Sequence, residues 1–85
     1  MDEVDYISLR GPIERENGKL VKRIPLDAGG ERLQVAARGI CEIDGDDLVV
    51  TIPHWFAQKI EIGEGTEVYV DDRSGKFNIT KVEVH

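Results

Sequence analysis

The sequence predicts a small, mostly β, single-domain protein, and three observations support this. The chain has 85 residues, which suits one domain rather than two. Short runs of β-branched or alternating apolar residues recur between turn signals rich in Gly, Asn, Asp and Pro. One segment, 54–60, has the spacing of a short helix. We expect six or seven short strands and this helix, in a domain spanning 1–85 with an N-terminal hairpin portion at 6–38 and a second portion at 40–80.

The first predicted elements are a short strand and a hairpin. Residues 6–9 alternate apolar and polar side chains, and Gly11-Pro12 is expected to end that strand. Asn17-Gly18 is a strong hairpin signal because both residues tolerate positive φ. It should join a strand at 13–16 to one at 19–24.

The second arm of this hairpin should present two different faces. One side carries Leu20, Lys22 and Ile24, and the other carries Val21 and Arg23. Pro25 ends the strand, and Gly29-Gly30 marks a turn or loop with no strand–glycine–helix context for phosphate binding. The segment 33–37 fits either a strand or a single helical turn, and we favour the strand.

The middle of the chain predicts two strands and the helix. Strands are expected at 40–43 and 48–52, and the second is the more secure because it is rich in β-branched residues. The acidic segment 44–47 should be the turn between them. Pro53 suits the first position of a helix over 54–60, in which Phe56 and Ile60 share one face.

The C-terminal part predicts a final pair of strands. A strand at 67–70 should follow the glycines of 63–65, with its valines inward. A turn at 72–75 should then lead into a strand at 77–84. The apolar residues of this last strand change phase halfway, so a bulge or bend is expected near Thr80-Lys81.

The net charge of −6 is unevenly distributed. Residues 1–38 hold seven basic and seven acidic side chains, whereas 39–85 hold four basic and ten acidic ones. A nucleic-acid-binding protein needs a basic face to neutralise phosphates. Such a face would therefore have to come from the first half.

Small size favours self-association. A chain this short buries a limited fraction of its surface and gains from disulfides, a structural metal or oligomerisation. Cys41 is a single cysteine, and Cys41, His54 and His85 lack zinc-ligand spacing. We therefore expect a homodimer without metal or other cofactor.

The expected location is the cytoplasm. A lone cysteine fits a reducing compartment. The acidic N-terminus does not resemble a signal peptide, and no apolar run approaches the ~20 residues of a membrane span. No membrane association is expected.

A segment similar in sequence to the strand at 48–52 occurs earlier in the chain. The segment 20–25 (LVKRIP) matches 48–53 (LVVTIP), so that Leu20 corresponds to Leu48 and Pro25 to Pro53. Each segment follows an acidic turn that contains glycine. Either the chain contains a duplication, or any strand ended by proline looks like this.

The stretch LVVTIPHWFAQKIEIGEGTEVYVDDRSGKFNI resembles the AbrB/MazE-like (SpoVT-AbrB) swapped-hairpin family. The shared pattern is a strand ending in Ile52-Pro53, the short helix at 54–60, the Gly-containing turn at 62–65 and a hairpin over 67–79. The resemblance covers about 40–80, with a possible weaker second copy at 13–39. It implies a small swapped-hairpin-like β-barrel in which two copies interleave as a dimer.

The resemblance also implies a function. Its members are dimeric DNA-binding transcription regulators, or antitoxins that bind DNA and a toxin. Basic residues on the first strand would contact DNA, and here they are Lys19, Lys22 and Arg23 of the weaker copy. The corresponding stretch of the better copy, 42–47, is acidic and departs from this pattern. An alternative function is an acidic, β-rich protein-interaction module that keeps the fold without binding DNA.

Other candidate residues are weaker. His54 and Trp55 could form a partner-binding rim, since tryptophan is enriched at binding hot spots, or could pack structurally. Cys41 reads as a small buried apolar residue rather than a nucleophile, because neither histidine has a reason to lie beside it. The run Asp44, Asp46, Asp47 lacks the rest of a calcium loop. No catalytic set is found, so the protein is not expected to be an enzyme.

Overall fold

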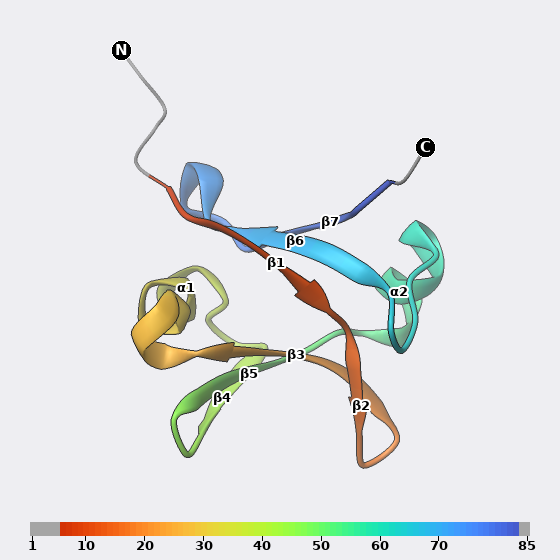
Figure 1. The fold of residues 1–85 in the computed structure, drawn as a ribbon, viewed down its shortest axis with the longest axis horizontal. Helices are drawn as coiled ribbons and strands as arrows, with labels where there is room; N and C mark the ends of the chain where they lie inside the picture. The colour runs from red at the N-terminus through yellow and green to blue at the C-terminus, as the bar shows by residue number, and fades with distance from the viewer. Residues whose placement is uncertain (1–5, 84–85) are drawn as a thin grey trace.

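The structure is a computed structural model that describes residues 6–83. Within them the chain forms seven strands, two α-helices and two 3-10 turns (Figure 1). In chain order the elements are β1 (Ser8–Pro12), β2 (Glu14–Glu16), β3 (Lys19–Pro25), η1 (Leu26–Ala28), α1 (Gly30–Ala36), β4 (Cys41–Asp44), β5 (Asp47–Thr51), α2 (His54–Ile60), β6 (Glu67–Asp71), η2 (Arg73–Gly75) and β7 (Asn78–Lys81).

The strands form two antiparallel sheets, which confirms the mostly β prediction. A four-stranded sheet has the order β2-β3-β5-β4, and a three-stranded sheet has the order β1-β6-β7. Figure 1 shows the two sheets as stacked layers, with α1 and α2 at opposite ends. The pairings among residues 6–83 do not close into a barrel. Each α-helix in the described residues has seven residues, too few to span a membrane.

The two hairpins of the four-stranded sheet have the same register. In the first hairpin, Glu14 lies opposite Val21. In the second, Glu42 lies opposite Val49. The second pair is shifted along the chain by the same number of residues that separates the LVKRIP and LVVTIP segments. The similarity of the two segments in sequence therefore extends to the structure of their hairpins.

The two central strands meet at equivalent positions. β3 and β5 are antiparallel, and Lys22 lies opposite Val50, which is its own counterpart in the second segment. The strand pairing is therefore the same on both sides of the Lys22–Val50 pair, as it would be about a local two-fold axis. The equivalence ends after the prolines, where β3 continues into η1 and then α1 but β5 leads directly into α2. The β6–β7 hairpin has no counterpart in the first half of the described chain.

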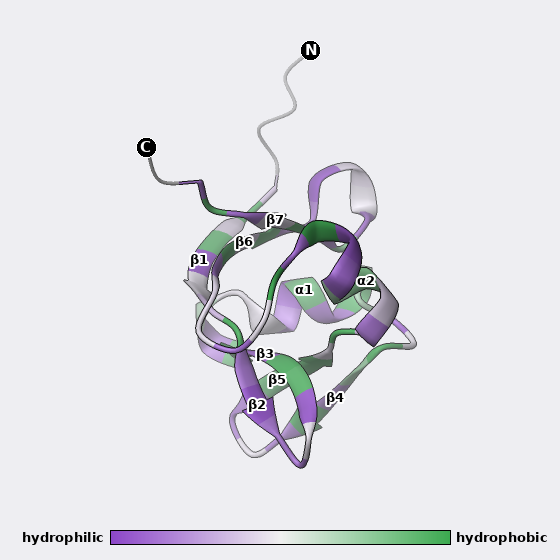
Figure 2. Ribbon diagram, turned by 90° about the vertical axis from the view of Figure 1, so that its right-hand side faces the viewer, coloured by the Kyte–Doolittle hydropathy of each residue, from purple (hydrophilic) through white to green (hydrophobic). Residues whose placement is uncertain are grey.

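The core lies between the two sheets and is closed by the helices. β5 supplies its centre, since Leu48 and Val50 have no exposed surface. Figure 2 shows the layers from the side, with β5 largely hydrophobic, β2 hydrophilic and β4 at the margin of its sheet. The buried core residues are Ile13, Ile24, Leu33, Ala37, Leu48, Val50, Ile52, Ala57, Ile62, Val68 and Val70.

Several local predictions are confirmed. Asn17 and Gly18 both have positive φ, 53° and 79°, as a type I′ hairpin turn requires. The helix α2 covers the predicted residues 54–60, and its Phe56 and Ile60 both pack against the core. In β6 the valines point inward as expected.

The strand predicted at 33–37 is wrong. Residues 30–36 form α1, and Leu33 and Ala37 are both buried on one helical face. Gly29 adopts φ 109° before the helix, and Gly30 packs so closely that a Cβ there would lie 2.7 Å from the Ile24 carbonyl oxygen. The glycine pair therefore starts a helix packed on the end of β3.

Two boundary predictions are also wrong. The first strand does not stop before Gly11-Pro12 but includes both residues, because β1 is an edge strand and edge strands tolerate proline. Of the bulge or bend expected near 80–81, the bulge is absent, since β6 and β7 pair in unbroken register from Val68 opposite Lys81 onward. The phase problem is removed because β7 ends at Lys81; positions 84 and 85 lie outside the described residues.

Candidate interaction site

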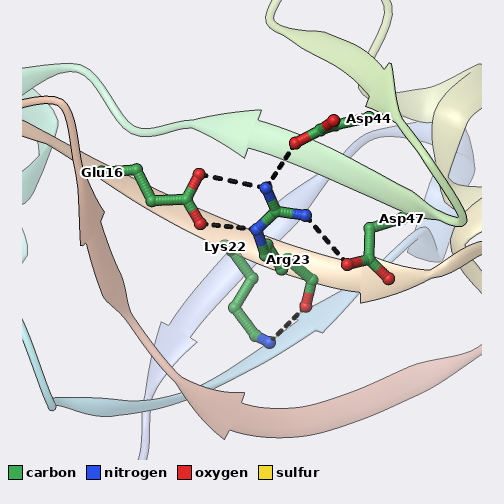
Figure 3. Close-up of polar contacts among 5 residues, drawn as sticks. All are labelled: Glu16, Lys22, Arg23, Asp44 and Asp47. Atoms are coloured by element: carbon green, nitrogen blue, oxygen red, sulfur yellow. Dashed lines mark hydrogen bonds and ion pairs between the residues drawn. The ribbon is translucent and has the colours of Figure 1, made fainter.

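Arg23 is the centre of an ion-pair cluster on the outer face of the four-stranded sheet (Figure 3). Its Nε lies 2.5 Å from Glu16 Oε2, and its two Nη atoms lie 2.5 Å from Asp44 Oδ2 and 2.8 Å from Asp47 Oδ2. We call these four residues the Arg23 cluster. The hydrogen bonds that Arg23 donates to Glu16, Asp44 and Asp47, in decreasing order of effect, raise the pKa of Arg23 above its usual value. Three carboxylates thus surround one guanidinium.

Lys22 points to the opposite side of the same strand, into the interior. It is 8% exposed, and its Nζ donates a hydrogen bond of 2.9 Å to the Arg23 carbonyl oxygen. A Cβ at Gly11 of β1 would lie 3.0 Å from this Nζ, so the ammonium lies beneath the other sheet. Burial lowers the pKa of Lys22, and the charges of Glu14 and Glu67 partly offset this.

The three residues predicted to contact DNA therefore do not share one cationic face. Lys19 is exposed, Lys22 is buried on the other side of β3, and Arg23 is paired with three acids. The carboxylates of Asp44 and Asp47 come from the second half of the chain, so the sequence spacing alone did not bring them to Arg23. Glu16, which lies between Arg15 and Lys19 in the sequence, was the available signal for a local ion pair.

The rest of this outer face is acidic. Side chains at paired positions of a sheet share a face, so Glu14 and Glu42 lie on the same side as Arg23, beside Val21 and Val49. The cations on this side are Lys19 and Arg23, and the carboxylates outnumber them. Phosphate groups would be repelled here, whereas a cationic partner would be attracted.

An apolar groove lies beside Trp55, at one end of the sheet pair. It has a volume of about 230 Å³, and its lining residues are Ile40, Val50, Thr51, Ile52, Pro53, Trp55, Phe56, Phe77 and Ile79. Trp55 is 66% exposed and meets the Phe56 ring edge-on at 5.7 Å between centroids. Exposed tryptophan beside an apolar groove is typical of a protein-binding surface.

His54 and Trp55 line different hollows. Trp55 borders the apolar groove, whereas His54 lines an adjoining hollow with Leu20 and Ile62, and the two hollows share Thr51, Ile52 and Pro53. The sequence reasoning placed both on one rim and missed Ile40, Phe77 and Ile79. Phe77 and Ile79 reach the groove from the end of the chain, so only the fold brings them to Trp55.

The apolar groove continues onto the acidic outer face. A further hollow, distinct from the one beside His54 and of about 470 Å³, shares Ile40, Thr51 and Pro53 with the groove and extends to Glu16 and Glu42. One end of the combined surface is therefore apolar and the other is acidic. A partner with both apolar and basic side chains would match it.

Cys41 lies at the start of β4 and is half-buried, with its Sγ 4.0 Å from the Gln34 carbonyl oxygen. Among residues 6–83 no group of three His, Cys, Asp or Glu side chains is placed to hold a metal ion.

No family model, curated protein or solved structure matches this chain.

Arg23 provides a test of the cluster. Arg23→Gln should destabilise the fold clearly more than Arg15→Gln, because it leaves three carboxylates without their common cation, whereas Arg15 pairs only with the exposed Glu64 at 3.2 Å among the ion pairs of the described residues. Urea denaturation in low and high salt measures the difference. The deficit of Arg23→Gln should shrink in high salt, because salt screens the remaining repulsion. Equal stability of the two variants would contradict a structural role for the cluster.

Proposed function

We propose that this protein is an acidic, β-rich protein-interaction module that does not bind DNA. The observation that supports this most strongly is the state of the predicted DNA-binding residues, since Lys22 is buried and Arg23 is neutralised. Counterion release from DNA requires cations that are free to approach phosphates. Lys19 alone is a weak basis for such binding, and the acids around it oppose it.

The proposed partner is a protein with a basic surface and apolar contact residues. Trp55 serves as the apolar anchor, and the net charge of −6 steers a cationic partner toward the protein. The contiguity of the Trp55 groove with the acidic outer face supports one partner that uses both.

A second candidate is the AbrB-like DNA-binding regulator or antitoxin, acting as a homodimer and binding DNA, a toxin or both. The equal registers of the two hairpins favour it, because they support a repeat that includes the Ile-Pro strands. In this candidate a second chain would supply the counterpart of the β6–β7 hairpin that the first half lacks, and the swapped-hairpin barrel would close across the dimer. Sedimentation equilibrium distinguishes a dimer from a monomer.

A DNA-binding measurement separates the candidates. In fluorescence anisotropy at low salt, we expect no binding of a labelled mixed-sequence duplex. Salt-dependent binding that is lost in Lys19→Gln would overturn the proposal and favour the second candidate.

Trp55→Ala tests the proposed anchor. Truncation of a hot-spot tryptophan should weaken binding of a partner isolated on the immobilised chain by about tenfold or more. Tyr69→Ala is the matched control, because Tyr69 is another exposed aromatic but lies on β6, away from the groove. Unchanged affinity of Trp55→Ala would remove the groove from the interface.

A further inference from the structure

The two equivalent edges of the four-stranded sheet, at β2 and at β4, differ in their backbone hydrogen bonding. Ile13, just before β2, exchanges backbone hydrogen bonds with residues ahead of β6: its N–H donates to the Thr66 carbonyl at 2.9 Å, and its carbonyl accepts from the Gly65 N–H at 2.8 Å. The counterpart of Ile13 in the second hairpin is Cys41, at the start of β4. Among residues 6–83, β5 is the only strand that pairs with β4, so its other edge is open.

The phase of the β4–β5 ladder shows which backbone groups are free. The Thr51 N–H donates to the Ile40 carbonyl at 3.0 Å, which makes this a hydrogen-bonded pair. In an antiparallel ladder such pairs alternate, so Glu42 and Asp44 also bond toward β5. The N–H and C=O groups of Cys41 and Ile43 therefore point away from the sheet, ready to pair with another strand.

The side chains of β4 define what that strand would carry. Glu42 and Asp44 are exposed on the outer face. Cys41 and Ile43 lie on the opposite face, and Ile43 is 46% exposed. A strand added here would place one set of alternating residues beside the carboxylates and the other set beside Ile43.

A second copy of this chain does not fit this edge. If two β4 strands paired, Glu42 and Asp44 of one chain would face the same carboxylates of the other, and like charges across a ladder are destabilising. Basic side chains at those positions would instead form cross-strand ion pairs. Charge complementarity thus selects a basic segment of another protein.

We infer that the free edge of β4 is a strand-addition site for an extended segment in which Lys or Arg alternates with apolar residues. Main-chain hydrogen bonds to Cys41 and Ile43 provide the register, and Glu42 and Asp44 select the charge. Ile40, 43% exposed, precedes β4 and also lines the Trp55 groove, so the added segment extends toward that groove. This inference rests on the proposed interaction function and names the partner's form.

The test uses the full chain and synthetic peptides. The probe is a capped peptide of alternating lysine and valine, compared with one in which glutamate replaces lysine and one in which the lysines and valines form separate blocks. We expect the alternating lysine peptide to slow amide hydrogen exchange at Cys41 and Ile43, as measured by NMR. Neither comparison peptide should do so.

Two variants localise the contact. Ile43→Pro removes one outward N–H without breaking the β5 ladder and should weaken peptide binding about fivefold, whereas Ile43→Val retains it. Glu42→Lys should weaken binding of the lysine peptide by about fivefold and let the glutamate peptide bind. Glu31→Lys makes the same change in net charge on α1 rather than on β4 and should change little.

Binding of the lysine peptide without protection of the β4 amides, or equal effects of Glu42→Lys and Glu31→Lys, would overturn the inference, because the peptide would then be held by net charge alone. No binding at millimolar peptide would overturn it as well. These failures are distinct from failure of the proposed function, which depends on duplex binding and on Trp55→Ala. Loss of the edge site would leave a Trp55-dependent partner intact.

Discussion

Leu48→Ala should destabilise the protein by about 2–5 kcal/mol, the usual range for a fully buried leucine. Leu48 has no exposed surface and lies on β5, opposite Ile24 of β3 and Ile43 of β4. Removing its side chain leaves a cavity between the sheets that the neighbouring strands cannot fill without breaking their ladders. Urea denaturation followed by far-UV circular dichroism measures the loss.

Leu20→Ala is the matched control for this prediction. Leu20 is the counterpart of Leu48 and occupies the equivalent place in the first hairpin, but it is only half-buried. Its truncation should therefore cost clearly less. Equal losses in the two variants would mean that both hairpins contribute equally to the core, contrary to the uneven burial of the two leucines.

Elements with strong local signals could be predicted from the sequence. The Asn17-Gly18 turn, the β-branched run of β5 and the helix after Pro53 depend on backbone preferences within a few residues. The hairpin registers follow from such turns, so the repeat could be suspected before the fold was known. Tertiary packing therefore did not alter the backbone conformation that these local preferences predict.

Elements without a local signal were mispredicted for identifiable reasons. In 33–37 the apolar residues fit a strand and a helical turn equally well, and packing of Leu33 and Ala37 decided for the helix. At the end of the chain, the prediction took 77–84 as one strand, whereas β7 ends at Lys81. A strand's end is set by where its partner β6 ends, which is a property of the fold.

The candidate site was predictable only in part. The alternation along β3 placed Lys22 with Leu20 and Ile24, two apolar residues, and this was the signal that it would face the core. The sequence could not supply the carboxylates of Asp44 and Asp47 at Arg23, because they come from the neighbouring hairpin. The open edge of β4 is likewise a consequence of sheet order rather than of any local pattern.

Replacing Lys22 should stabilise the protein. Lys22 is 8% exposed, and within the described residues its ammonium makes one hydrogen bond, to the Arg23 carbonyl. Lys22→Met keeps the length of this side chain and removes the ammonium. Burial of an incompletely satisfied polar group costs on the order of 1 kcal/mol or more, and the thioether avoids this cost. We expect a gain in unfolding free energy of about 1–2 kcal/mol at neutral pH. Lys19→Met, at an exposed position of the same strand, should give almost none.

The pH dependence identifies the buried ammonium as the cause. Burial lowers the pKa of Lys22 in the folded state from 10.5, so between the folded-state value and about 10.5 the unfolded chain binds a proton that the folded chain has lost. Stability relative to Lys22→Met therefore rises with pH across that interval. The advantage of Lys22→Met should be full at neutral pH and shrink as the pH approaches 10.5. An advantage that is independent of pH would show that better packing, and not removal of a buried charge, is responsible.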